Sequence, residues 1–232
     1  MDPRTALITG ASRGLGRALA TALNARGWRL VVDGRDPTRL ATTVATLPDA
    51  ALVTALPGDV ADPGHRTALA AAVGPQLDLL VNNASDLGPS PLPPLAELDP
   101  GELARVLAVN TVAPLALFQA VLPVLAPGAT VVQISSDAAV EAYEGWGGYG
   151  ASKAALDHLT AVLAVEHTAL RVYAVDPGDM RTDMHQAAFP GEDISDRPTP
   201  ESVVPGLLAL LDGELPSGRY RAADVVPAEA AR

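Results

Sequence analysis

The segment Thr9-Gly10-Ala11-Ser12-Arg13-Gly14-Leu15-Gly16 decides the fold of this 232-residue chain. It follows a short apolar stretch, residues 5–9, and opens a predicted helix over 15–26. Glycines in such a turn let the backbone approach a diphosphate, and the first amides of the following helix lack intrahelical partners. A strand, a glycine-rich turn and a helix in this order therefore predict a nucleotide site at the start of an α/β fold.

Strands and helices alternate along the rest of the chain. The further expected strands are 29–33, 50–56, 77–81, 130–134, 170–175 and 218–223, and the further expected helices are 38–46, 62–73, 100–125, 149 to about 167, and 200–211. Asp62 and Thr199 are expected to cap two helices, and Pro114 to kink the long one. The alternation predicts one domain over 1–232, a Rossmann-like, doubly wound parallel sheet of about seven strands with helices on both faces.

Composition excludes several classes of protein. The formal charge of −11 argues against nucleic acid or an anionic membrane surface as a partner. The chain has no cysteine, so it has neither disulfides nor thiolate metal sites, and its four histidines lack the spacing of metal ligands. Prolines interrupt the longest apolar run, 112–125, which is too short to span a bilayer, and no secretory signal is visible. We therefore expect a cytoplasmic protein without a bound metal.

The chain contains fifteen arginines but one lysine, Lys153, four residues after Tyr149. Because arginine serves every other cationic position, position 153 is expected to need a compact ammonium. The i, i+4 spacing puts both side chains on one helix face, about 5–6 Å apart at Cβ, where the ammonium can lower the pKa of the phenol. Such a tyrosine can act as a general acid or base, whereas the alternative is an exposed surface pair. Tyr143 is excluded, since Gly147 stands four residues after it.

These features and further motifs, in the right order, resemble the classical short-chain dehydrogenases/reductases. The resemblance covers about residues 5–223, and the glycine turn matches the Thr-Gly-x-x-x-Gly-x-Gly of that family. The other matching motifs are Gly58-Asp59-Val60, Asn82-Asn83-Ala84, Val109-Asn110, Ser135-Ser136, and Pro177-Gly178 with Thr182.

The resemblance implies a catalytic role for four residues. Tyr149 would exchange a proton with the substrate oxygen, while Lys153 would lower the pKa of Tyr149 and bind the nicotinamide ribose. Ser136, rather than Ser135, would hold the carbonyl oxygen, because thirteen residues separate it from Tyr149 as in the family. Asn110 would hold a water that relays protons from Lys153. The alternatives are a strand-end turn for the serines and a polar group at a helix kink for Asn110.

The end of the second strand determines the cofactor in this family. The acidic position that selects NAD falls on Gly34, and Arg35 takes the arginine position of members that prefer NADP. Arg13 is a second cation, while Asp33 is the alternative that would favour NAD. The resemblance thus implies NADP(H) rather than NAD. The implied cofactor-binding residues are Gly10, Ser12, Arg13, Gly14, Leu15, Gly16, Arg35, Asp59, Val60, Asn83, Tyr149, Lys153, Pro177, Gly178 and Thr182.

Two features depart from the family pattern. Ser85 replaces the glycine of Asn-Asn-Ala-Gly, which is expected to narrow the space near the cofactor without touching the chemistry. The connection 166–170 is short, so we expect a packing interface on the preceding helix to differ from that of the family. Residues 179–198 should cover the substrate. Their candidate contacts are Met180, Met184 and Phe189, which are apolar, and Arg181 and His185, which are polar.

The expected function is NADP(H)-dependent hydride transfer between nicotinamide and a small-molecule carbonyl or alcohol. The alternatives are a non-catalytic NADP-binding regulator, which the intact catalytic set opposes, and an epimerase or dehydratase that never releases its cofactor. We also expect a homodimer or homotetramer, because two long helices are apolar on more than one face. The residues concerned are Ala113, Leu115, Leu117, Val121, Leu156, Leu159, Val162 and Leu163.

Overall fold

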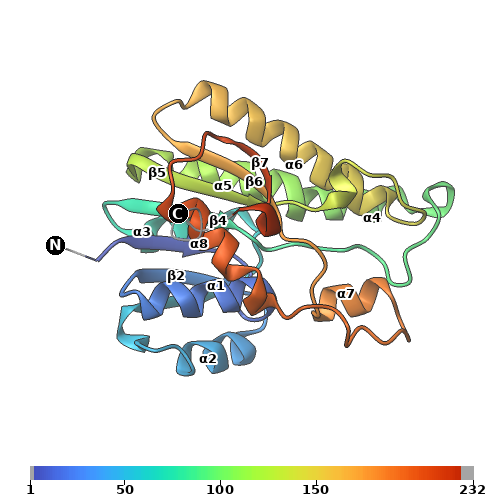
Figure 1. Ribbon diagram of the computed structural model, residues 1–232, viewed down its shortest axis with the longest axis horizontal. Helices are drawn as coiled ribbons and strands as arrows, with labels where there is room; N and C mark the ends of the chain where they lie inside the picture. The colour runs from blue at the N-terminus through green and yellow to red at the C-terminus, as the bar shows by residue number, and fades with distance from the viewer. Residues whose placement is uncertain (1–2, 226–232) are drawn as a thin grey trace.

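A parallel seven-stranded sheet forms the centre of the molecule (Figure 1). The structure is a computed structural model that describes residues 3–225, so the expected domain 1–232 extends past the described residues at both ends. The strand order is β3-β2-β1-β4-β5-β6-β7, and the order reverses direction between β1 and β4. The strands are β1 (Thr5–Ile8), β2 (Arg29–Gly34), β3 (Val53–Pro57), β4 (Leu77–Asn82), β5 (Leu125–Ile134), β6 (Arg171–Asp176) and β7 (Gly218–Arg221). The predicted doubly wound sheet is confirmed.

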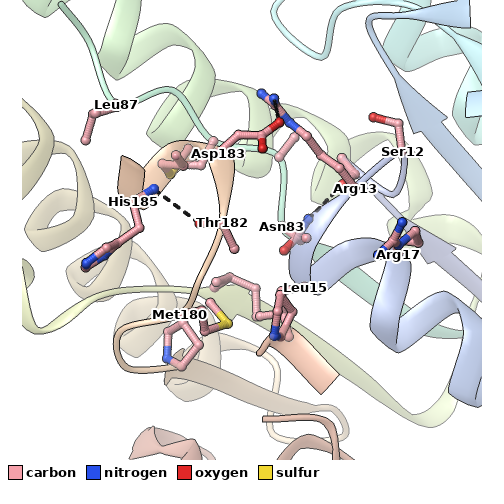
Figure 2. Close-up of a pocket in the computed structure, with 18 of the residues that line it drawn as sticks. Ser12, Arg13, Leu15, Arg17, Asn83, Leu87, Met180, Thr182, Asp183 and His185 are labelled. Atoms are coloured by element: carbon pink, nitrogen blue, oxygen red, sulfur yellow. Dashed lines mark hydrogen bonds and ion pairs between the residues drawn. The ribbon is translucent and has the colours of Figure 1, made fainter. Parts of the chain in front are cut away.

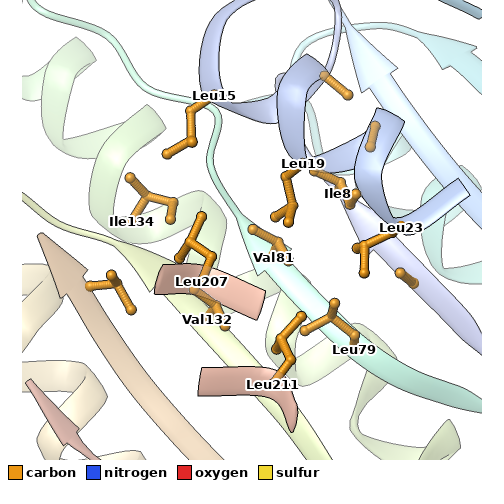
Figure 3. Packing of buried hydrophobic residues seen from close by; sticks show 14 of the residues in the cluster. Ile8, Leu15, Leu19, Leu23, Leu79, Val81, Val132, Ile134, Leu207 and Leu211 are labelled. Carbon is orange, nitrogen blue, oxygen red and sulfur yellow. The ribbon is translucent and has the colours of Figure 1, made fainter. Parts of the chain in front are cut away.

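Helices cover both faces of the sheet. They are α1 (Gly14–Ala25), α2 (Pro37–Ala45), α3 (Pro63–Val73), α4 (Pro100–Leu107), α5 (Ala113–Val121), α6 (Gly147–Glu166), α7 (Asp183–Ala188) and α8 (Val204–Asp212). Side chains alternate between the faces along each strand, so Ile8 and Val32 lie in one core and Leu7 and Val31 in the other. Figure 3 shows the first core, in which leucines of α1 and α8 pack on β1, β4 and β5. The second core joins α3, α5 and α6 to the opposite face.

Helix ends follow the expected chemistry at one position and depart from it at another. Asp62 caps α3, since its carboxylate accepts a hydrogen bond from the amide of Gly64 at 2.9 Å. The predicted Thr199 cap is wrong, because its side chain makes no capping bond and its carbonyl instead accepts the amide of Ser202 at 3.0 Å. A 3₁₀ turn, Pro200–Ser202, therefore precedes α8. Short 3₁₀ turns also replace the start of the expected strand 50–56 and the end of 218–223.

The expected long helix 100–125 is interrupted rather than continuous. A π-helical turn, Ala108–Val112, joins α4 to α5, and a 3₁₀ turn, Leu122–Val124, follows. Pro114 has no N–H to donate to the carbonyl of Asn110, four residues earlier, so the distortion falls just before the proline. By length and composition Pro100–Val124 could cross a membrane, with a mean hydropathy of 1.7. Half of its most apolar window is buried in the fold, where α4 contacts α6 and α5 contacts α3.

Candidate active site

A cleft of about 900 Å³ opens at the carboxyl ends of the strands, around the point where the strand order reverses. It is lined by the glycine turn at one end and by the segment around Tyr149 at the other. All but two of the predicted site residues line it. The exceptions are Gly16, which lies under the glycine turn, and Asn110, which is fully buried behind Ser85.

The glycine turn takes a backbone shape that needs glycine. Gly10 and Gly14 have φ values of 67° and 56°, and a Cβ on Gly16 would stand 2.5 Å from the side-chain nitrogen of Asn83. Helix α1 begins directly after the turn, and Arg13 at its N-cap makes no side-chain capping bond. The first-turn amides of α1 are therefore available to an anion, so the turn fits the diphosphate of a dinucleotide.

Asn83, a predicted cofactor contact, also holds this turn in place. Its amide nitrogen donates to the carbonyls of Thr9 and Gly10, at 2.9 and 3.2 Å, and its backbone N–H donates to the hydroxyl of Thr9 at 3.0 Å. The end of β4 thereby ties down the turn that follows β1. Asp59 and Val60 line the neighbouring wall, where Asp59 accepts the amide of Ala61 at 2.8 Å.

Asp33 lines the cleft, but it is buried and both of its carboxylate oxygens have partners. One of its carboxylate oxygens accepts the amide of Gly10 at 2.6 Å, and the other lies 3.1 Å from Nε2 of His65. Only 1% of Asp33 is exposed. The next two residues, Gly34 and Arg35, also line the cleft. The sequence analysis missed the His65 contact, although a carboxylate within an apolar strand signals a buried partner.

Four arginines line the end of the cleft beside the glycine turn: Arg13, Arg17, Arg35 and Arg39. Arg13 lies against Asp183 of α7 across the cleft, with 2.6 Å between Nη1 and Oδ2 (Figure 2). Arg39, which the sequence analysis did not single out, donates to the same oxygen at 3.0 Å. The hydrogen bond from Arg13, helped by that from Arg39, lowers the pKa of Asp183. We call these four arginines the cation cluster.

Tyr149 is buried at the other end of the cleft. Burial raises its pKa to about 12, although the hydrogen bonds between its hydroxyl and those of Ser85 and Ser136 act in the opposite direction. The net shift is opposite to the expected one, and a lowering of this pKa by Lys153 stays a prediction. The expectation that Ser85 stays clear of the chemistry is wrong, because its hydroxyl lies beside the phenol.

Lys153 lies on the same face of α6 as Tyr149, and both are buried, so they are not a surface pair. Its Nζ donates to the carbonyl of Ile134 at 2.7 Å and lies 5.5 Å from the centre of the Tyr149 ring. Burial lowers the pKa of Lys153 to about 8, with Asp157 acting weakly against that change. The ammonium thus points past the phenol toward the end of β5.

The two serines at the end of β5 have different surroundings. Ser136 lies beside Tyr149, and its hydroxyl donates to Asp137 at 2.9 Å. The hydroxyl of Ser135 is buried without a hydrogen-bond partner in the described part of the chain. Arg219, on β7, donates to the carbonyl of Ser136 at 2.9 Å. This long-range contact has no signal in the local sequence.

Asn110 is fully engaged through its side chain. Its oxygen accepts the hydroxyl of Ser85 at 3.2 Å and the amide of Asp86 at 2.7 Å, and its nitrogen donates to the carbonyl of Asp86 at 2.8 Å and the hydroxyl of Ser152 at 2.9 Å. A water held by Asn110 would therefore use its backbone carbonyl. Pro114 deprives that carbonyl of its α-helical donor.

The segment after β6 covers the cleft through the predicted residues Pro177, Gly178 and Thr182, all of which line it. Thr182 caps α7 by accepting the amide of His185 at 3.2 Å. Of the apolar candidates, Met184 packs in the cluster that contains Tyr149. Met180 instead packs against the core under α1 and α8, and Phe189 stacks on Trp146 and His185.

Comparison with known proteins identifies the family. Residues 4–193 match the family model for short chain dehydrogenases. The uncharacterized oxidoreductase YciK of Escherichia coli K12 is 32% identical over 91% of this chain and 87% of its own length. Sepiapterin reductase of Meriones unguiculatus is 37% identical over 78% of this chain and 76% of its own length.

A solved structure agrees with these sequence relationships. A short chain dehydrogenase of Escherichia coli CFT073, complexed with NADPH, superposes with a TM-score of 0.87 at 31% identity. The match covers 96% of this chain and 97% of the other. With the glycine turn, the reversed strand order and the paired Tyr149 and Lys153 already in place, the chain belongs to the short-chain dehydrogenases/reductases, a family of oxidoreductases.

Proposed function

We propose that this protein is an NADP(H)-dependent oxidoreductase that interconverts a small-molecule carbonyl and its alcohol. The observation that carries the proposal is the pairing of the only lysine in the chain with a buried tyrosine, at the opposite end of one cleft from the glycine turn. A cleft built this way brings a dinucleotide and a small substrate together. Bound nicotinamide would supply or accept the hydride.

The protein's own residues would handle the proton and the oxygen. In carbonyl reduction, Tyr149 donates its proton to the substrate oxygen, and in alcohol oxidation it takes that proton back. Ser136, beside the phenol, holds the same oxygen as negative charge develops on it. Lys153 supplies a nearby positive charge that stabilises the phenolate, provided that its ammonium leaves the carbonyl of Ile134.

The cation cluster supports NADP(H) as the cofactor. Arg13 and Arg35 occupy the positions implied by the family register, and Asp33 is committed to Gly10 and His65. An arginine fork binds a phosphate with two charge-assisted hydrogen bonds, which an unphosphorylated ribose cannot accept in the same way. The related structure from Escherichia coli CFT073 was solved with NADPH. The residues present therefore fit a phosphorylated dinucleotide.

The test is a pair of substitutions with a matched control. Tyr149→Phe should lower turnover of reducible carbonyls by at least about 10²-fold, the scale of positioned acid–base catalysis, and leave NADPH affinity within a few-fold. Lys153→Arg should fail as well, because a planar guanidinium does not place a compact charge between phenol and ribose. Tyr143→Phe is the control, since the Tyr143 hydroxyl is bonded to Asp137 and Glu141 at the surface.

Three results would contradict the proposal. A Tyr149→Phe protein that consumes NADPH like the wild type would remove the acid–base assignment. NADP(H) bound tightly in a protein that oxidises no alcohol and reduces no carbonyl would favour the regulatory alternative. Nicotinamide retained through dialysis, with no net redox turnover, would favour the epimerase or dehydratase alternative.

We also propose a homo-oligomer, on narrower grounds than the sequence suggested. Most of the apolar residues expected at the interface are buried within the single chain, and Val162 alone among them is exposed. Three other apolar side chains on or next to these helices are exposed, namely Val165 on α6, Val112 before α5 and Leu122 after it. A second copy of this chain is the proposed partner for these helices. Cytoplasmic localisation stays a prediction.

A further inference from the structure

Residues 179–198, which we call the cover of the cleft, include an acidic side chain that binds two arginines of the cation cluster. Asp183 begins α7 and lies against Arg13 (Figure 2). Its Oδ2 lies 2.6 Å from Nη1 of Arg13 and 3.0 Å from Nη1 of Arg39. The arginines come from different elements, the glycine turn and α2, and both lie more than 140 positions from Asp183 in the sequence. One anionic oxygen shared by two guanidinium groups is the arrangement that a phosphate oxygen would also adopt.

The residue before Asp183 brings the cover over the glycine turn. The Cγ2 of Thr182 lies 3.6 Å from the place where a Cβ on Gly14 would stand. Gly14 opens α1, whose first turn has no side-chain cap. Thr182 and Asp183 thus bring the cover beside the glycine turn, next to Arg13.

The other two arginines of the cluster are held differently. Arg17 is paired with Glu201 at 3.9 Å, a longer contact than those of Asp183. Among residues 3–225, Arg35 makes no ion pair. An arriving phosphate therefore finds Arg35 ready, whereas Arg13 and Arg39 must first be released.

We propose that Asp183 is a cofactor-specificity residue, which occupies Arg13 and Arg39 until the 2′-phosphate of NADP(H) displaces it. This inference rests on the proposed use of NADP(H), and it adds Arg39 to the arginines that bind the phosphate. Displacement of Asp183 frees α7. Binding of the phosphate therefore also releases the cover, whose Met184 packs in the cluster that contains Tyr149. A cofactor without the phosphate leaves the Asp183 contacts intact.

Two nucleotides that differ by one phosphate test the proposal. Adenosine 2′,5′-bisphosphate and adenosine 5′-monophosphate would be titrated calorimetrically into wild type and Asp183→Asn. The bisphosphate should bind the variant about three- to tenfold more tightly, because two exposed ion pairs no longer compete, while affinity for the monophosphate should change by less than about twofold. Arg39→Ala should weaken only the bisphosphate, and Asp183→Asn should then have a smaller effect in the double variant.

A matched control and a second readout separate this role from a general change in charge. Asp212→Asn removes the same charge from a residue that pairs with Arg26 at 2.8 Å outside the cleft, and it should leave both affinities unchanged. In hydrogen exchange, the bisphosphate but not the monophosphate should speed exchange of the α7 amides in wild type. Asp183→Asn should show fast exchange without any nucleotide.

The outcomes distinguish a failure of the role proposed for Asp183 from a failure of the NADP(H) proposal. If wild type prefers the bisphosphate but Asp183→Asn leaves the ratio of the two affinities unchanged, Asp183 is not a competitor and the inference is refuted alone. If wild type binds both nucleotides equally, the NADP(H) proposal is refuted, and the role of Asp183 is refuted with it.

Discussion

Replacing Lys153 by methionine is expected to stabilise the fold at neutral pH while removing the proposed activity. Lys153 is 2% exposed, donates one hydrogen bond to the carbonyl of Ile134, and forms no ion pair with the described residues. Burial lowers its pKa from 10.5 to about 8. Below pH 8 the folded protein therefore holds a buried ammonium that the unfolded chain would expose to water. Methionine has a similar length and carries no charge.

The pKa difference sets the size and the sign of the effect. A fall from 10.5 to about 8 corresponds to about 3 kcal/mol of destabilisation at pH values below 8. The lost hydrogen bond to Ile134 offsets about 2 kcal/mol of the gain, so the variant should be about 1 kcal/mol more stable at pH 7. Between pH 8 and 10.5 the unfolded chain holds a proton that the folded chain has released. The stability of wild type therefore rises with pH relative to the variant.

Urea unfolding of the protein without cofactor measures this difference. The free energy of unfolding of wild type and Lys153→Met would be compared at pH 7, 8, 9 and 10, so that titrations common to both proteins cancel. Arg26→Met is the control, because an exposed arginine keeps its charge over the whole range and should give a difference independent of pH. A Lys153→Met difference that is equally flat would show that the ammonium is not desolvated, and would refute the reasoning.

Three further predictions concern the cofactor, the phenol and the assembly. Gly34→Asp alone should lower the melting temperature, because its Cβ would stand 2.8 Å from the Cβ of Ser12. Gly34→Asp combined with Ser12→Gly should fold normally and prefer NADH in a fluorescence titration. An unchanged NADPH preference in this double variant would contradict the family register assigned to the end of β2. Ser85→Gly removes a hydrogen bond that lowers the pKa of Tyr149, so the pH profile of alcohol oxidation should move to higher pH, and an unmoved profile would contradict the contact. Val165 is 78% exposed and should lie in the interface between copies of the chain. Val165→Glu should therefore reduce the mass measured by light scattering toward that of one chain, 23.7 kDa. A wild-type protein that is already monomeric would refute the homo-oligomer.

The fold could be predicted because its signals are local. Apolar strands, helix starts such as Asp62 with Pro63, and a turn that needs glycine at positions 10 and 14 depend on residues close together in the chain. The pairing of Tyr149 with Lys153 is local too, since the pitch of a helix brings residues four apart onto one face.

Burial and long-range contacts were decided by the tertiary structure alone. The direction of the shift in the Tyr149 pKa depends on desolvation, which a helical spacing does not reveal. Ser85 contacts Asn110 and Tyr149 only because the segment after β4 packs against the π-helical turn and the start of α6. Asp183 contacts Arg13, which lies 170 positions earlier in the sequence, because the segment after β6 passes over the cleft. Sequence spacing determines which side chains share an element, whereas the charges and hydroxyls that surround them come from elements brought together by folding of the whole chain.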